Sequence, residues 1–233
     1  TGGYGGAIHG PLRRVSFGSD YARTSIMECF QENLEHFPVL LPDVFNDPVK
    51  KFEHLRLHNG TIWRWNRPLI GFDDDSTPHI RIEHRTPSAG PTIIDSIANA
   101  AFYYGLTKNL CDDIIANGIP LDFSQAKDNF YQAARFSLDS HIIWFDRKKH
   151  NLQKLLQAEL LPRARQGLQS LNIDATDIHA YLNIIEQRIA NKQTGSQWQR
   201  QFMQQADVTF QDMTKAYLNR QYSEIPVSQW ELD

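Results

Sequence analysis

The sequence predicts an α+β protein in which a small antiparallel sheet is followed by a helical C-terminal region. Three observations lead to this class. Apolar residues recur at helical spacing near the start of the chain, alternate with polar residues from His54 to Thr86, and return to helical spacing beyond Phe123. Because strands and helices occupy separate stretches, the pattern does not fit a doubly wound α/β fold.

The first predicted element is an amphipathic helix within Ser19 to Leu34, where Ile26 and Phe30 lie on one face. Prolines from Pro38 onward end it. Three segments with the period of a strand follow: HLRLH, TIWRWNR and HIRIEHR. The sequence GFDDDSTP between the last two is typical of a loop, and its three adjacent aspartates indicate a solvated turn and not a metal site.

A long helix is predicted next, from Pro91 to Asn117, and because it is apolar on most sides we expect it to be buried. Every periodic segment beyond Phe123 is helical, with an interruption at Pro162 and another near Gly195. The tail aromatics fit either a core or the interface of a homo-oligomer. We therefore divide the chain into residues 1–120, which hold the sheet, and residues 121–233, which form a helical tail.

Charge and cysteine content exclude several classes of function. With 24 Lys and Arg against 27 Asp and Glu, the net charge of −3 provides no general field for nucleic acid or anionic lipid. No run approaches the roughly 18 apolar residues that span a bilayer. Cys29 and Cys111 lie too far apart for a CxxC zinc site or a disulfide framework. We expect a cytoplasmic protein with no nucleic-acid or membrane partner.

The last predicted strand carries the candidate site. Alternation places four side chains on one face: His79, Arg81, Glu83 and Arg85. The flanking guanidinium groups favour an ionised Glu83. A carboxylate between two guanidinium groups suits a magnesium nucleotide, since Mg²⁺ prefers oxygen and arginine donates to phosphoryl oxygens in pairs. The same pattern also fits a solvated polar face, which half-exposed antiparallel strands commonly carry.

Arginines in the neighbouring segments favour the first of these interpretations. Arg56 lies in HLRLH, and either Arg64 or Arg67 of TIWRWNR lies on the ionic side of its strand. Repeated arginine with very little lysine is typical of planar, bidentate recognition of phosphate or carboxylate. Three cationic strand faces would then line one surface.

The stretch HNGTIWRWNRP (58–68), followed by PHIRIEHRTPSAGPTIIDSIANAAFYYGL (78–106), resembles the glutamate-cysteine ligase family of the carboxylate-amine ligase superfamily. The segment from Arg81 to Arg85, with the helix after Pro91, is also similar to the RxExR strand of glutamine synthetase. The likeness is close from about Val15 to Leu106 and looser in the tail, where LLPRARQGL and PVSQW resemble the family. It implies that residues 1–120 are the C-terminal part of a glutamine synthetase-like catalytic domain.

The resemblance implies an ATP- and magnesium-dependent ligase, active in glutathione biosynthesis, that joins an amino acid such as glutamate to an amine through an acyl phosphate. Carried over to this chain, Glu83 would be a magnesium ligand and Arg81 would face the nucleotide phosphates. Arg85 would hold the substrate carboxylate or the phosphoryl group in transit.

The resemblance also implies that Arg64 and Arg67 add positive charge to the reaction centre and that His58 and Asn59 line the cofactor site. Such ligases take further metal carboxylates from a strand nearer the N-terminus, and nothing before Arg56 offers that pattern on a strand. We therefore expect a catalytic-half fragment that is inactive alone and that a missing N-terminal half of the same protein completes.

Two other functions stay open on the sequence. A non-enzymatic module would keep the arginine-rich face as an anion-binding or assembly surface, and the missing carboxylates support it. A phosphotransferase of the creatine-kinase type would use the same arginines with a guanidino acceptor. A further candidate nucleotide contact, His9, lies in the glycine-rich opening of the chain.

Overall fold

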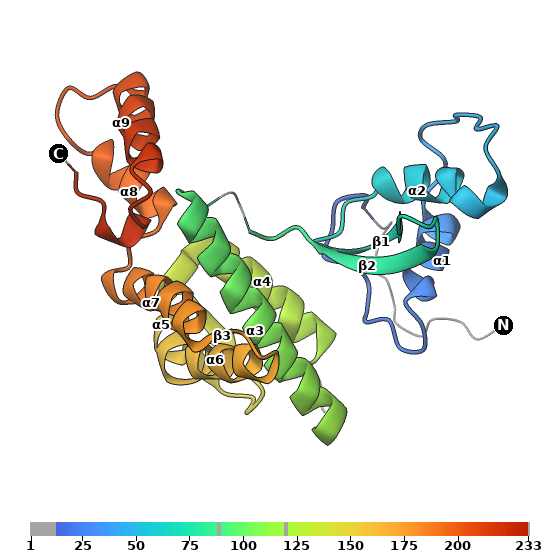
Figure 1. The fold of residues 1–233 in the computed structure, drawn as a ribbon, viewed down its shortest axis with the longest axis horizontal. Coiled ribbons are helices and arrows are strands. Elements are labelled where there is room, and N and C mark those ends of the chain that lie inside the picture. The colour runs from blue at the N-terminus through green and yellow to red at the C-terminus, as the bar shows by residue number, and fades with distance from the viewer. Residues whose placement is uncertain (1–12, 88–89, 119–120, 233) are drawn as a thin grey trace. The chain divides into compact units, whose positions relative to one another are not determined.

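The computed structural model describes residues 13–87, 90–118 and 121–232. It confirms the predicted α+β class, with two small antiparallel sheets of two strands and a helical C-terminal region (Figure 1). Contacts divide the chain into two compact units, Thr1–Ser88 and Ala89–Asp233. This division lies well before the boundary at residue 120 expected from the sequence, because the long helix α3 (Ile93–Asn117) packs against helices of the second unit.

In the N-terminal unit, α1 (Met27–His36) begins later than the sequence predicted. The Glu28 carboxylate accepts hydrogen bonds from the backbone amides of residues 23–25, at 2.7 to 3.0 Å. These amides would have to turn away from the carboxylate if the helix started earlier. The segment before α1 is therefore a loop that the first turn of the helix holds in place.

The amide donors around Glu28 lead to a prediction about pH. They lower the pKa of the Glu28 carboxyl below its usual 4.5. A carboxyl group whose pKa is lower in the folded than in the unfolded protein stabilises the fold fully at pH values above its unfolded pKa. This stabilisation is lost as the pH falls through the folded-state pKa. We expect Glu28→Gln to destabilise the N-terminal unit at neutral pH and to flatten the acid branch of its stability curve.

Urea unfolding between about pH 3 and pH 7 measures this effect. The matched control is Glu35→Gln, because Glu35 lies on the same helix but accepts a hydrogen bond only from the Gln31 side chain, at 2.7 Å. If the stability of the two variants falls equally between about pH 7 and pH 3, the pH dependence does not come from Glu28.

The segment HLRLH is helical and not a strand, since α2 spans Glu53–Gly60. An alternation of five residues is too short to distinguish the two states. In the helix Leu55 and Leu57 are half-buried and the next residues along the chain, His58 and Asn59, are fully buried. The third cationic strand face expected from the sequence is therefore absent.

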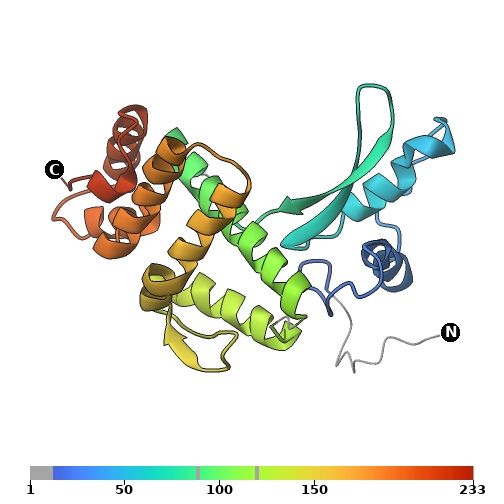
Figure 2. The ribbon, with the colours of Figure 1, turned by 60° about the horizontal axis from the view of Figure 1, so that its bottom comes forward.

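A single hairpin forms the first sheet, and Figure 2 shows it as a long twisted ribbon. Strand β1 (Asn66–Phe72) pairs antiparallel with β2 (Pro78–His84), and the loop between them exposes the three aspartates, as predicted. The strand expected from residue 61 begins only at Asn66. Before it, Trp63 forms an isolated parallel bridge with Val15, so this backbone pairs with the start of the chain.

The C-terminal unit is built around α3, which packs on α6 (Leu161–Ser170) and α7 (Ala175–Asn191). The helices α3 and α6 meet where Gly105 faces Gly167, and a side chain on either glycine would overlap the backbone of the other helix. The main hydrophobic core lies along this contact and comprises Ala98, Leu161, Ala164, Leu168, Ile178, Leu182, Ile184, Ile185 and Ile189.

The expectation that α3 is buried on most sides is wrong. Ile93, Ile97, Tyr104 and Ile115 are 74, 45, 62 and 83% exposed. The packed side of the helix carries the buried Asp95, Ala98 and Gly105 together with the partly buried Ile94, Phe102 and Leu106, while a second set of apolar residues points outward. The exposed apolar positions need a separate explanation.

The helical tail contains a second hairpin that the sequence analysis missed. Strands β3 (His141–Ile143) and β4 (Lys149–Asn151) follow α4 (Phe123–Phe136). Strands of three residues are too short to show a period. The side chain of Asn129 on α4 holds this hairpin by pairing with both backbone groups of Ile143, at 2.7 and 3.0 Å.

The remaining helices agree with the predicted stripes. Helix α5 (Leu152–Leu155) passes through a π-helical turn (Leu156–Leu160) into α6, so Pro162 does not break the segment. Helices α8 (Gly195–Phe202) and α9 (Phe210–Tyr222) close the unit around an aromatic cluster of Trp198, Phe202, Tyr217 and Trp230. Short 3₁₀ turns occur at Val49–Lys51, Ser137–Asp139 and Val227–Gln229.

Within the described part of the chain, no helix is both long enough and apolar enough to cross a bilayer.

Candidate functional site

Two charged residues of the predicted strand face, Glu83 and Arg85, meet Arg67 at one end of the β1–β2 hairpin. Arg67 on β1 lies directly opposite Glu83 on β2. Its Nη2 and Nε donate to Glu83 Oε2 at 2.8 and 3.1 Å, and Arg85 Nε lies 3.6 Å from the same oxygen. We call these three residues the Arg–Glu cluster. The sequence had placed Arg81 and Arg85 around Glu83, whereas the closest guanidinium comes from the neighbouring strand.

Arg85 is positioned by two tryptophans. Its backbone amide donates to the Trp65 carbonyl at 2.8 Å, which extends the strand pairing beyond β2. Its guanidinium carbon lies 3.3 Å from the centre of the Trp63 ring, a cation–π contact. Because the ring covers one face of the guanidinium, the side chain has a defined direction. Trp63 thus forms a wall beside the Arg85 guanidinium.

The Glu83 carboxylate is anchored through one oxygen. All of its hydrogen bonds and ion pairs in the described structure involve Oε2, and none involves Oε1. The side chain is 34% exposed. A carboxylate that is fixed on one side and open on the other can offer Oε1 to a hard cation without moving.

The Arg67 guanidinium makes most of its hydrogen bonds within the protein. Its Nη1 donates to the carbonyls of Asn59, Gly60 and Ile62, at 3.3 to 3.4 Å, around the C-terminal end of α2. A cation there satisfies carbonyls that the helix leaves unpaired. The residue is only 8% exposed. Arg67 therefore joins α2 to Glu83 and has little capacity left for a ligand.

Arg64 is not part of the cluster. Its Nη2 lies 3.3 Å from Glu32 Oε2 on α1, its Nη1 donates to the Arg13 carbonyl at 3.4 Å, and its guanidinium lies over the Phe37 ring. The side chain is buried. The structure thus assigns Arg64 a bracing contact with α1. Glu32 was missed as its partner because nothing local in the sequence links residues so far apart.

His58 and Asn59 are buried and hold the unit together. His58 Nε2 hydrogen-bonds the Phe37 carbonyl at 3.1 Å. The Asn59 amide donates to the Pro68 carbonyl at 2.8 Å and accepts from Asn33 Nδ2 at 3.0 Å. These contacts connect α2 with α1 and β1, so the two residues support the hairpin from behind. Asn33 is a further supporting residue that the sequence analysis did not single out.

Arg81 lies on the same strand face as Glu83, two residues away, and opposite Leu69. It is exposed, and no ion pair of its guanidinium occurs among the described residues. The sequence predicted Arg81 as one of two guanidinium groups flanking Glu83, whereas the ion pairs of Glu83 in the described structure are with Arg67 and Arg85. Arg81 is thus the member of the predicted set with most freedom to meet an external anion.

The described residues contain no group of three or more His, Cys, Asp or Glu side chains that could hold a metal ion by themselves. Two small cavities in this unit, of about 60 and 70 Å³, lie beside α1 and α2, and neither is lined by the Arg–Glu cluster. Burial, more than the nearby carboxylates, raises the pKa of the Cys29 thiol beside the first cavity, which agrees with an inert thiol. His9 lies outside the described residues.

No family model, curated protein or solved structure matches this chain. The function is therefore argued from the Arg–Glu cluster and the sequence resemblance.

Proposed function

We propose that this chain carries part of the catalytic site of an ATP- and magnesium-dependent carboxylate-amine ligase similar to glutamate-cysteine ligase. The observation that carries the proposal is the Glu83 carboxylate, held through Oε2 by Arg67 and Arg85 while Oε1 stays open. A solvated polar face does not require such an anchor, since exposed ion pairs contribute little to stability.

The donor set fits magnesium bound together with a nucleotide. Mg²⁺ commonly takes only one or two protein carboxylates and completes its coordination with water and phosphate oxygens. Glu83 would be the protein ligand of this chain. The bound ion would neutralise charge on the transferring phosphoryl group.

The proposed reaction has two steps. An oxygen of the substrate carboxylate attacks the γ-phosphorus, the bond from that phosphorus to ADP breaks, and an acyl phosphate forms. The amine nitrogen then attacks the acyl carbon, inorganic phosphate leaves, and the nitrogen loses a proton. Phosphoryl transfer depends mainly on positioning and charge neutralisation, so arginines can serve it without a protein nucleophile.

The proposal gives each of these residues a role that fits its contacts. Arg81, exposed on the face of Glu83, would meet the nucleotide phosphates, and Arg85, oriented by Trp63, would hold the substrate carboxylate or the phosphoryl group. Arg67 is a positioning residue, since it acts through Glu83. Arg64, His58 and Asn59 brace the unit and would not touch the ligand.

A non-catalytic anion-binding module is the second candidate, and one observation favours it. Among the described residues Glu83 belongs to no group of three or more His, Cys, Asp or Glu side chains that could hold a metal ion. Such a module would bind phosphate or carboxylate through Arg81 and Arg85 and would show no turnover.

Calorimetric titration of the chain with a non-hydrolysable ATP analogue, with and without Mg²⁺, tests the proposed site. We expect binding that requires Mg²⁺ and that is lost in Glu83→Gln, while Asp74→Ala in the exposed loop binds as the wild type does. Binding that depends on neither Mg²⁺ nor Glu83 would support the anion-binding module. Absence of binding would overturn both the ligase and the module.

ADP release then tests the reaction class, measured on the full-length protein because the chain alone is expected to be inactive. A requirement for both an amino acid and an amine supports the ligase. Release with a guanidino acceptor alone would support a phosphotransferase and overturn the ligase.

A further inference from the structure

The exposed apolar residues of α3 form a narrow stripe along one side of the helix. At about 100° per residue, five positions fall within roughly 40° of arc. They are Ile93, Ile97, Tyr104, Cys111 and Ile115, all exposed. We call this set the α3 stripe. It extends over about 33 Å at 1.5 Å per residue. Apolar patches exposed on a soluble protein often mark an interaction site.

The α3 stripe has the same spacing in both directions from its centre. Ile97 and Cys111 lie seven residues on either side of Tyr104, and Ile93 and Ile115 lie eleven residues on either side. Two copies of the helix that run antiparallel, with a two-fold axis at Tyr104, would therefore match at every position. Ile93 would face Ile115 of the other copy, and Ile97 would face Cys111. A two-fold contact requires this kind of self-complementary surface.

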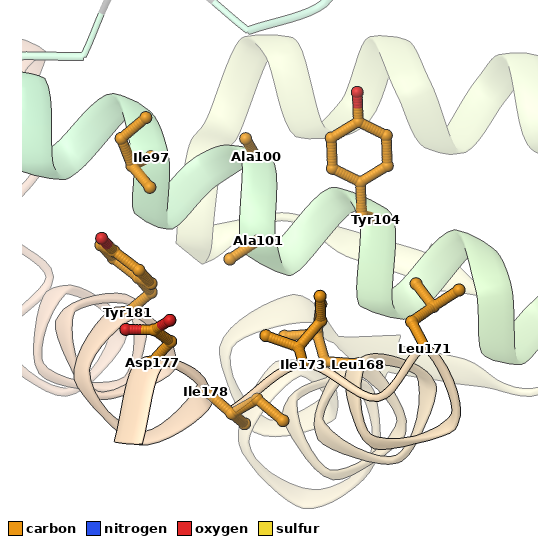
Figure 3. A pocket seen from close by; sticks show the side chains of 10 residues that line it. All are labelled: Ile97, Ala100, Ala101, Tyr104, Leu168, Leu171, Ile173, Asp177, Ile178 and Tyr181. Carbon is orange, nitrogen blue, oxygen red and sulfur yellow. The ribbon is translucent and has the colours of Figure 1, made fainter. Parts of the chain in front are cut away.

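A shallow apolar groove of about 340 Å³ borders the stripe (Figure 3). Its α3 side includes Ile97 and Tyr104, and its other side is formed by α7 and the end of α6. Figure 3 shows Asp177 of α7 on the side of the groove across from Ile97. Asp177 is exposed, and no ion pair of its carboxylate occurs in the described part of the chain.

The antiparallel register also matches charge. It places Lys108 of one copy opposite Ala100 of the other, and Ala100 lines the same groove as Asp177. Lys108 lies about 20° beyond the edge of the stripe, on the same side of the helix as Ala101, which lines the groove. In the antiparallel pair Lys108 of one copy would therefore lie near Asp177 of the other copy. The symmetry produces this pairing twice. Among the described residues of one chain, Lys108 pairs only with Asp112, at 2.5 Å, on the exposed surface.

We propose that the α3 stripe is the interface of a two-fold symmetric dimer of this chain, with the two α3 helices antiparallel and Tyr104 at the axis. This inference is independent of the proposed ligase function. It explains why a helix whose sequence is apolar on most sides has an exposed apolar face.

Sedimentation of the 233-residue chain tests the interface. We expect a dimer that Ile115→Asp converts to monomer, with at least a tenfold rise in the dissociation constant. The matched control is Ala116→Asp, which adds the same charge one residue along but about 100° away from the stripe; Ala116 is also exposed. Circular dichroism of each variant confirms that the helices are retained.

Disulfide trapping tests the register. In the antiparallel arrangement Ile97→Cys faces the native Cys111 of the other copy, so mild oxidation should link two chains, and Cys111→Ser in the same background should prevent it. Wild-type chains should not link, since their Cys111 residues lie far apart across the two-fold axis. A monomeric wild type, a dimer insensitive to Ile115→Asp, or wild-type chains joined through Cys111 in a parallel pair would each overturn the proposal. A monomer that Ile115→Asp destabilises would show that another part of the chain covers the stripe.

Discussion

Replacing Asp95 by alanine is expected to lower the free energy of unfolding of the C-terminal unit by about 3–5 kcal/mol, the range found when one partner of a buried ion pair is removed. Asp95 has no exposed surface. Its Oδ1 lies 2.6 Å from Arg188 Nη2, and its Oδ2 accepts from the Thr92 hydroxyl at 2.8 Å and from the Val227 amide at 3.0 Å. The carboxylate thus ties α3 to α7 and to the C-terminal segment.

The cost arises from the groups left behind. Arg188 would be a largely buried cation without its carboxylate, and its Nε already has no hydrogen-bond partner among the described residues. The Val227 amide would lose its acceptor as well. Unsatisfied buried donors cost more than the hydrogen bond itself contributes. Asp95 is therefore one of the side chains that hold the segment PVSQW, together with Asn191 and Gln193, which donate to backbone carbonyls of that segment.

The control for Asp95 is Asp139→Ala. Asp139 pairs with Lys192 at 2.6 Å, the same distance as in the Asp95–Arg188 pair, but the two side chains are 74 and 48% exposed. An exposed pair contributes about 0–1 kcal/mol. Urea unfolding followed by tryptophan fluorescence measures both variants. Equal losses would show that burial of Asp95 has no role in the stability of this unit.

Arg85→Ala is expected to lower the proposed ligase turnover by a factor of about 10³ or more, the effect of removing an arginine that stabilises a phosphoryl transition state. The variant removes the guanidinium that lies over Trp63 and near Glu83. The fold should persist, because Arg67 still neutralises Glu83. Single-turnover and steady-state ADP release by the full-length protein measure the change, and unchanged circular dichroism confirms folding.

Two further variants show whether the loss is specific to Arg85. Arg85→Lys keeps the charge but not the planar fork, so we expect only partial activity. Asp74→Ala changes an exposed loop carboxylate and should leave turnover within about twofold of the wild type, as expected for a surface change without a partner. An Arg85→Ala enzyme with wild-type turnover, or an Asp74→Ala enzyme without activity, would contradict the proposed site.

The α3 stripe shows how one sequence pattern can have two outcomes. A helix that is apolar on most sides is normally a buried helix, and the sequence analysis placed α3 in the core. The backbone contact of Gly105 with Gly167 instead lets α6 approach closely on one side, where small residues suffice. Phe102 and Leu106 still pack against the core, whereas Ile93, Tyr104 and Ile115 on the other side of the helix stay exposed.

The candidate site was predictable only in part. Strand alternation by itself placed Arg81, Glu83 and Arg85 on one face, because the side-chain period of a strand is a local property of the backbone. The hairpin loop and most helices of the tail follow from local patterns in the same way. Alternation over five residues could not distinguish helix from strand at α2.

The sequence alone determined which residues share the ionic face of β2, since that depends on neighbouring residues of one strand. Only the tertiary structure decided what the other arginines do. Arg67 pairs with Glu83 and donates to carbonyls at the end of α2. Arg64 pairs with Glu32 on α1. Burial and ion pairing depend on partners distant in the sequence, and no local period encodes them.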